Sequence, residues 1–177
     1  NAGGYFGPYL KFSGWDALEI QGIAERDVII VIDGDEGRVT IEEAPLEPLD
    51  THLLGGFLTE MYAKDERDRR SVSVVSAGQG AEHSRYAGLN FSWYDVRRKE
   101  ARVKQAGRGG SGRVFRHKRI KAIVVRYSQM TGESNNPANM DLIRKAGRRI
   151  NKEIADLDSK QNDMRSVGTG HLPPIMN

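Results

Sequence analysis

The sequence predicts an α+β fold, in which a mixed, mostly antiparallel β-sheet platform carries a hairpin and two or more packing helices. Three observations favour it. Two β-branched runs enclose a short Gly/Asp loop, further strand-like runs precede and surround a first helical pattern, and a long helical pattern comes last. Strands and helices do not alternate strictly, and this lack of alternation favours α+β.

The clearest local element lies near the N-terminus. After an opening rich in glycine and aromatic residues, we expect a short strand at residues 17–21. Residues 28–32 and 38–42 are β-branched and flank Asp33-Gly34-Asp35-Glu36-Gly37, a loop of hairpin length. A hairpin is therefore predicted here.

A first helix is predicted after Pro45 and Pro48, with Asp50 or Thr51 as its cap. Four apolar residues recur at the spacing of one helix face: Leu54, Phe57, Leu58 and Met61. The charged residues 64–70 are interpreted as a solvated helix end and loop. Residues 71–76 are a predicted strand and residues 77–88 a predicted loop.

The C-terminal half predicts two more strands, at residues 89–96 and 120–127, of which the second is buried. A long helix is predicted to begin near Asn136 and Pro137. Its apolar face consists of Ile143, Ala146, Ile150, Ile154 and Leu157. A polar link at 158–166 leads to Gly168-Thr169-Gly170 and an abrupt end, so we expect the chain to be a piece of a longer protein.

The composition is that of a globular protein. With 177 residues, 38% hydrophobic and 29% charged, the chain is long enough to bury a sizeable core, and no apolar run approaches the roughly 18 residues of a membrane span. No signal-peptide pattern begins the chain, so a cytoplasmic location without membrane contact is expected. The absence of Cys excludes disulfides, Cys-ligated zinc and an iron–sulfur cluster held by this chain alone.

A glycine-rich loop at residues 107–112 lies within a basic run at 97–121, although the net charge is only +3. Glycines let a backbone approach a ligand closely, and the flanking cations suit phosphate. The loop formally matches a dinucleotide fingerprint, but it lacks the buried strand and crossover helix that a Rossmann unit needs. A flexible surface turn and a basic nucleic-acid patch with Trp93 and Tyr94 remain open from the residues alone.

The other residues that could form a site are interpreted as structural or solvent-exposed. Ser84 and His83 are adjacent in sequence and lack a nucleophile elbow, so no serine triad is predicted. Carboxylates on predicted element faces are assigned to salt bridges or solvation. Tyr5, Phe12 and Trp15 are interpreted as core packing.

Several motifs, in order, resemble the N-terminal domain of the tungsten-containing aldehyde ferredoxin oxidoreductase family. They are Asn1-Ala2-Gly3-Gly4-Tyr5-Phe6-Gly7, Leu10-Lys11-Phe12-Ser13-Gly14-Trp15-Asp16-Ala17, Ala106-Gly107-Arg108-Gly109-Gly110-Ser111-Gly112 and Lys121-Ala122-Ile123-Val124-Val125. Gly168-Thr169 with Met176-Asn177 is similar to the start of the family's next domain. The resemblance covers nearly the whole chain.

The resemblance implies a pterin-cofactor platform domain at residues 1–130, followed at 131–177 by a helix and the truncated start of a helical domain. It implies a tungsten or molybdenum bis-pterin cofactor whose phosphates are bridged by Mg²⁺. The implied Mg²⁺ ligands are the backbone carbonyls of Asn1 and Gln105. The implied cofactor-binding residues are Asn1, Gly3, Gly4, Lys104, Gln105, Ala106, Gly107, Arg108 and Gly109.

The implied activity is oxidation of an aldehyde to a carboxylic acid, with electrons passing through a [4Fe-4S] cluster in the full-length parent to ferredoxin. No catalytic side chain is assigned to this segment, and the isolated chain is expected to be inactive. The remaining domains of the parent chain, and a second copy in a homodimer, are further expected partners. The alternative is a non-enzymatic module that binds nucleic acid or another polyanion through residues 97–121.

Overall fold

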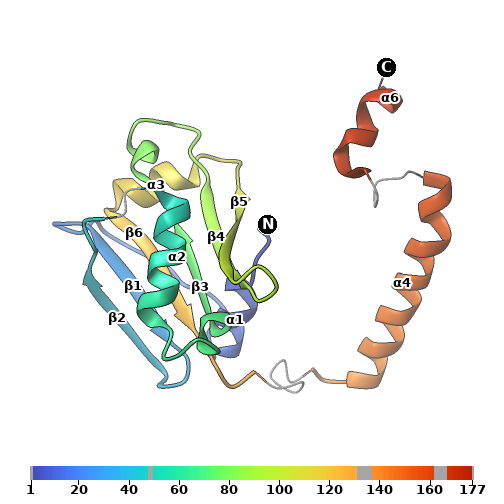
Figure 1. Ribbon diagram of the computed structural model, residues 1–177, viewed down its shortest axis with the longest axis horizontal. Helices are drawn as coiled ribbons and strands as arrows, with labels where there is room; N and C mark the ends of the chain where they lie inside the picture. The colour runs from blue at the N-terminus through green and yellow to red at the C-terminus, as the bar shows by residue number, and fades with distance from the viewer. Residues whose placement is uncertain (1, 48–49, 131–136, 162–166, 177) are drawn as a thin grey trace. The chain divides into compact units, whose positions relative to one another are not determined.

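The computed structural model describes residues 2–47, 50–130, 137–161 and 167–176. The chain divides into two compact units, unit 1 (Asn1–Asn135) and unit 2 (Asn136–Asn177) (Figure 1). The larger unit holds every residue of the predicted cofactor site.

Unit 1 is built on one six-stranded sheet of order β2-β1-β6-β3-β4-β5. Its strands are β1 (Val28–Asp33), β2 (Arg38–Glu43), β3 (Val72–Ser76), β4 (Leu89–Asp95), β5 (Glu100–Ala106) and β6 (Ile120–Arg126). Only the β1–β6 pair is parallel, and the other four pairs are antiparallel. The mixed, mostly antiparallel sheet and the hairpin of β1 and β2 are therefore confirmed.

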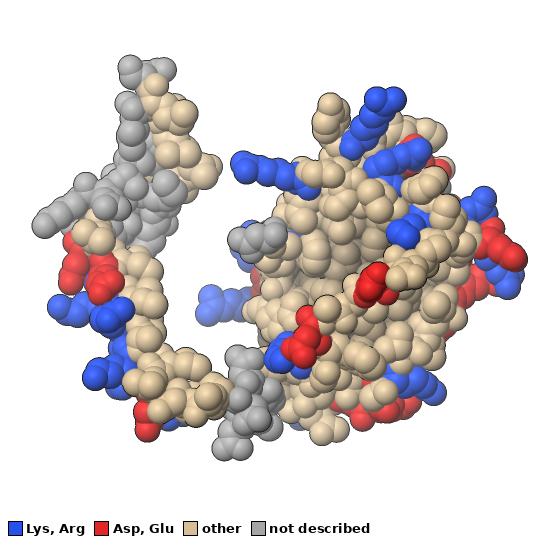
Figure 2. All heavy atoms as spheres, turned by 180° about the vertical axis from the view of Figure 1, so that it is seen from behind, with Lys and Arg blue, Asp and Glu red and all other residues tan. Residues whose placement is uncertain are grey.

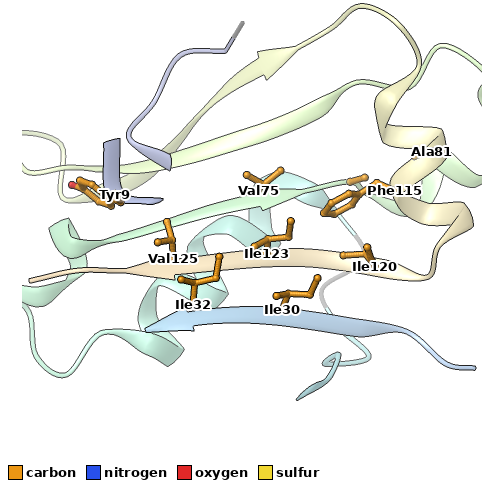
Figure 3. Packing of buried hydrophobic residues seen from close by; sticks show 10 residues of the cluster. Tyr9, Ile30, Ile32, Val75, Ala81, Phe115, Ile120, Ile123 and Val125 are labelled. Carbon is orange, nitrogen blue, oxygen red and sulfur yellow. The ribbon is translucent and has the colours of Figure 1, made fainter. Parts of the chain in front are cut away.

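Helices cover both faces of this sheet. Helix α2 (Thr51–Tyr62) packs on one face, where Leu54 and Leu58 meet apolar residues of β1, β3 and β6 (Figure 1). The opposite face carries α1 (Phe6–Phe12) and α3 (Ser111–His117), whose Tyr9 and Phe115 cover Ile30, Ile123 and neighbouring residues (Figure 3). All seven residues of β6 are buried, as expected for a central strand covered on both sides.

Helix α2 begins as predicted, and it buries two of the four residues of the predicted apolar face. The Asp50 carboxylate accepts hydrogen bonds from the backbone N–H of His52 at 2.7 Å and of Leu53 at 3.2 Å, which is N-capping. Leu54 and Leu58 are fully buried, but Phe57 is 45% exposed and Met61 is 57% exposed. The two small residues Gly55 and Thr59 complete the buried face instead, because the helix approaches β4 and β5 closely there.

The segment predicted as a solvated loop at 64–70 ends in a buried ion cluster. A 3-10 helix, η1 (Asp68–Ser71), places the Asp68 carboxylate 2.8 Å from Nε of Arg126, whose side chain is 5% exposed. Arg126 also reaches Asp35 at 2.7 Å and Asp33 at 3.5 Å. The solvated interpretation is therefore wrong for Asp68, because the cation that neutralises it lies far along the chain.

The N-terminal segment differs most from expectation. Residues 17–21 form no strand, and they are mostly exposed. A helix that was not predicted, α1, precedes them, and its Phe6 and Phe12 are partly buried against the core. Core packing is wrong for Tyr5 and Trp15, which are 48% and 42% exposed.

Unit 2 contains the long helix α4 (Met140–Gln161), then η3 (Gly168–His171) and α6 (Leu172–Met176). The Asn139 side chain accepts a hydrogen bond from the backbone N–H of Leu142 at 2.9 Å and so caps α4. The predicted start at Asn136 lies outside the described residues. None of the helices in the described ranges is long and apolar enough to cross a membrane.

Candidate cofactor-binding loop

The glycine-rich loop connects the edge strand β5 to the seven-residue helix α3. Gly109 and Gly110 have φ of +85° and +66°, in the left-handed region that side-chain-bearing residues rarely adopt. Gly110 is also the residue that precedes the first turn of α3. Glycine at these two positions therefore permits the sharp turn from strand to helix.

The C-terminal part of the loop rests on the backbone of residues 85–88. The backbone N–H of Gly112 donates to the carbonyl of Ala87 at 2.8 Å. A Cβ added to Gly112 would overlap the carbonyl oxygen of Gly88, and one added to Gly110 would overlap that of Arg85. Close packing thus explains why these positions are glycine.

Gly107 is different, because neither packing nor dihedral angle requires glycine there. A Cβ at Gly107 would meet nothing within 4 Å, and its φ is not positive. Gly109 is also open to added atoms, although its φ favours glycine. The open side of the loop is therefore free for close approach by a ligand.

The structure brings Gly3 to β5 and Gly4 to β4, two strands that lie far along the chain. A Cβ on Gly3 would lie 3.0 Å from Cγ of Lys104, and one on Gly4 would lie 3.4 Å from the carbonyl oxygen of Phe91. Gly4 has φ of +84°. Asn1, the other predicted residue of this segment, lies outside the described residues.

Lys104 and Gln105 present their side chains on opposite faces of the edge strand. The Lys104 ammonium lies 5.8 Å from the ring centroid of Trp93, within range of a cation–π contact. Gln105 donates from its amide to Oδ1 of Asn90 at 3.2 Å. Both residues are exposed, whereas Ala106 is half-buried.

Lys104 and Arg108 have no carboxylate partner among the residues that the structure describes. Arg108 is exposed on the loop. Most other cations of the basic run at 97–121 hold the fold together instead, by ion pairs or by hydrogen bonds to carbonyls: Arg98, Arg102, Arg113, Arg116, Lys118, Arg119 and Lys121. Seen from behind, several Lys and Arg side chains stand out at the rim of unit 1, and a few charged groups of both signs are scattered over the face between them (Figure 2).

The arrangement can bind an anion. It combines two cations that have no carboxylate partner among the described residues, backbone N–H groups of an open glycine loop, and two N-terminal glycines that lie against β4 and β5. Within the described ranges no three His, Cys, Asp or Glu side chains are grouped so that they could hold a metal ion. A metal at this edge would therefore depend on backbone oxygens or on ligands from a cofactor.

Sequence reasoning missed two elements of this site, β5 and α3. The alternation of Ala101 and Val103 with charged neighbours was a strand signal, obscured by the high charge of residues 97–104. It also missed Gly88, which lies against the loop backbone, with a Cβ added there 2.7 Å from the carbonyl oxygen of Ala106. A lone glycine before a strand gives no sign of a distant partner.

Comparison with known proteins gives matches along the whole chain. The family model described as "Aldehyde ferredoxin oxidoreductase, N-terminal domain" matches residues 1–127. The tungsten-containing aldehyde ferredoxin oxidoreductase of Pyrococcus horikoshii is 32% identical over 157 residues, which cover 86% of this chain and 23% of that protein. The protein of the same name from Thermococcus kodakarensis is 32% identical over 180 residues, covering 100% of this chain and 26% of that protein.

The chain thus spans about a quarter of the length of the curated relatives it matches. Among solved structures, the active site complex BamBC of benzoyl coenzyme A reductase in complex with 1,5-dienoyl-CoA is similar, with a TM-score of 0.49 and 30% identity. That match covers 72% of this chain and 17% of the other.

Proposed function

Because this chain belongs to the aldehyde ferredoxin oxidoreductase family, we propose that it is the N-terminal segment of a tungsten or molybdenum bis-pterin oxidoreductase. The whole protein would oxidise aldehydes to carboxylic acids and pass the electrons to ferredoxin. The observation that supports a binding role for this segment is the edge of β5, where Lys104 and Arg108 have no carboxylate partner in the described part of the chain and lie beside an open glycine loop.

The residues present suit the phosphate groups of such a cofactor. Lys104 offers an ammonium and Arg108 a planar guanidinium, which can bind phosphate oxygens in a bidentate way. The open side of Gly107 and the exposed Gly3 let a bulky group approach the backbone closely. Gly4, Gln105, Ala106 and Gly109 complete the proposed set of described residues.

The backbone carbonyl of Gln105, with that of Asn1, is our proposed contribution to a bridging Mg²⁺. Hard cations prefer oxygen ligands and keep part of their water shell, so two carbonyls and phosphate oxygens would suffice. The Gln105 side chain is not needed for this role.

When bound, the metal–pterin cofactor would supply the oxidation itself, in which an aldehyde gains oxygen from water and releases protons and an electron pair. This segment would bind and orient the cofactor and offset its negative charge through Lys104 and Arg108. With no Cys, the chain holds no ligand for a [4Fe-4S] cluster, which we place elsewhere in the whole protein.

The deciding experiment uses the whole protein purified without oxygen from cells supplied with tungstate. Metal content by mass spectrometry, pterin content by fluorescence after oxidation, and aldehyde-dependent dye reduction are measured together. We expect metal, pterin and activity to be present. A folded protein that contains neither pterin nor tungsten nor molybdenum would refute the proposal.

Matched variants then test the site. Replacing Arg108 or Lys104 by Gln should lower the pterin content of the purified protein, because each loses a charge-assisted contact to phosphate. Arg38→Gln is the control, because Arg38 is exposed on β2 at the other edge of the sheet. Equal pterin content in all three variants would show that Lys104 and Arg108 do not contribute to cofactor binding.

The alternative function, a polyanion-binding module, has its own test. A labelled oligonucleotide should then bind the 177-residue chain with affinity that falls steeply with salt, since neutralised phosphates release counterions. We expect weak binding at most, because most cations at 97–121 are committed to intramolecular contacts. The same preparation should show no aldehyde-dependent dye reduction.

A further inference from the structure

A second anion-binding site is suggested by a hollow beside the turn between β4 and β5, apart from the glycine-rich loop. Two adjoining cavities of about 580 and about 330 Å³ share Arg70, Tyr94 and Val96 in their walls. Cavities of this size are typical of small-molecule sites. We name them together the hairpin hollow.

Four cations line the hairpin hollow without a carboxylate partner among the described residues: Arg67, Arg70, Arg97 and Lys99. The two carboxylates in its walls are both paired with other arginines. Glu66 lies 3.8 Å from Arg69, and Asp95 lies 2.9 Å from Arg98. The hollow therefore carries an excess of positive charge that nothing in the described fold neutralises.

The backbone of the turn that carries Arg97 and Lys99 is held in place before any ligand arrives. Oδ1 of Asp95 accepts hydrogen bonds from the backbone N–H groups of Arg97 at 3.0 Å and Arg98 at 3.2 Å. The backbone N–H of Lys99 donates to the carbonyl of Asp95 at 2.7 Å, and Lys99 has φ of +56°. A turn fixed in this way presents Arg97 and Lys99 with little further loss of backbone entropy.

Aromatic rings also line the hairpin hollow. The Tyr5 ring is 48% exposed and its centroid lies 5.7 Å from that of Tyr9, and the half-buried Trp93 ring belongs to the same lining. The Tyr9 hydroxyl donates to the carbonyl of Arg70 at 2.5 Å, which ties α1 to η1. Aromatic rings and unpaired guanidinium groups that line one hollow are a combination that can bind a planar heterocycle with attached phosphates.

We propose that the hairpin hollow binds a small ligand that carries a planar base and a diphosphate, such as a nucleoside diphosphate. The base lies against Tyr5 and Trp93, and the diphosphate contacts Arg70 and Arg97. This site adjoins the proposed cofactor site at Trp93, whose ring lies 5.8 Å from the Lys104 ammonium, but neither Arg108 nor any glycine of the loop at 107–112 lines it.

Binding is measured on the 177-residue chain carrying Trp15→Phe, so that Trp93 is the only fluorophore of its kind. ADP should quench its fluorescence, and adenosine and pyrophosphate should each bind more weakly than ADP. Titration calorimetry on the unaltered chain gives the same dissociation constants independently. If adenosine or pyrophosphate binds as tightly as ADP, the proposal is wrong.

Two variants test the cations and the aromatic rings of the hollow separately. Arg97→Gln should raise the dissociation constants of ADP and pyrophosphate by about tenfold, the loss of one charge-assisted contact. Tyr5→Ala should weaken the binding of ADP and leave the affinity for pyrophosphate unchanged, because it removes only the aromatic ring. Arg38→Gln, on the opposite sheet edge, should change neither. The side chains replaced are exposed, and circular dichroism verifies that each variant is folded.

Two outcomes would overturn the proposal without touching the proposed cofactor site. One is unchanged ADP affinity in both Arg97→Gln and Tyr5→Ala. The other is an oligonucleotide that binds more tightly than ADP with a steep salt dependence, which would show a polyanion surface instead. Pterin content of the whole protein reports on Lys104 and Arg108 independently of either result.

Discussion

Replacing Arg126 by Met is the sharpest test of what holds unit 1 together. The Arg126 side chain is 5% exposed and pairs with Asp68, Asp35 and Asp33, whose side chains are 8%, 9% and 19% exposed. Met preserves much of the apolar stem but leaves three largely buried carboxylates without their cation. Such a change should destabilise the fold.

The size of the expected loss in stability depends on the hydrogen bonds that the carboxylates retain without Arg126. Breaking a buried ion pair by removing one partner costs about 3 to 5 kcal/mol. Asp68 still accepts from the backbone N–H of Lys64 at 2.9 Å, and Asp35 still accepts from Ser128 at 2.7 and 2.9 Å. We therefore expect the lower end, a loss of about 3 kcal/mol of unfolding free energy near pH 7.

The pH dependence gives a second signature. Burial alone would raise the pKa of the Asp68 and Asp35 carboxyls, but hydrogen bonds and the Arg126 charge outweigh it and hold each pKa below its ordinary value. A depressed pKa contributes stability above the unfolded value of about 3.9, and this stability is lost as pH falls through the folded value. Without Arg126, burial raises the pKa of these carboxyls. Protonation then removes the unpaired buried charges, so the stability difference between Arg126→Met and the unaltered chain should shrink toward pH 4.

Urea denaturation followed by tryptophan fluorescence measures this, because both tryptophans, Trp15 and Trp93, belong to unit 1. The exposed Arg38→Met is the control and should change stability by less than about 0.5 kcal/mol. A deficit for Arg126→Met below about 1 kcal/mol near pH 7, or one that grows on acidification, would refute the reasoning.

Three further substitutions test local features by the same denaturation assay. Asp50→Ala removes the N-cap of α2 and should cost about 1 kcal/mol, whereas Asp50→Ser should recover most of it; equal stability of both variants would exclude a capping role. Leu58→Ala should cost about 2 to 5 kcal/mol because Leu58 is fully buried, and Phe57→Ala clearly less; the reverse order would contradict the packing of α2. Gly112→Ala should cost about 1 to 3 kcal/mol through overlap with the loop backbone, while Gly107→Ala, which has open space, should leave the fold unchanged; a tolerated Gly112→Ala would show that the contact yields easily.

The residues of the candidate site stand out in the sequence, but their geometry does not. The glycines at 107–112 and their flanking cations indicated phosphate chemistry from composition alone. Which glycines are structural was not predictable, because Gly110 and Gly112 are constrained by the carbonyls of Arg85 and Gly88. The sequence separation between those segments hides the contact.

Local patterns determined the elements that the sequence identified correctly. The hairpin at residues 28–43, the buried strand β6 and the long helix α4 follow from β-branched runs, a Gly/Asp turn and helical spacing, which are all short-range signals. These elements were sufficient to predict the fold class, and the ordered motifs were sufficient to predict the family.

Tertiary structure alone decided the rest, since it depends on partners far apart in the chain. The face that α2 buries is set by its approach to β4 and β5, which selects Gly55 over Phe57. The burial of Asp68 depends on Arg126, and the position of Gly3 depends on Lys104. Charge and hydrophobicity along a sequence give each residue's preference for water, but only the folded chain supplies the opposite charge or the neighbouring strand that overrides that preference.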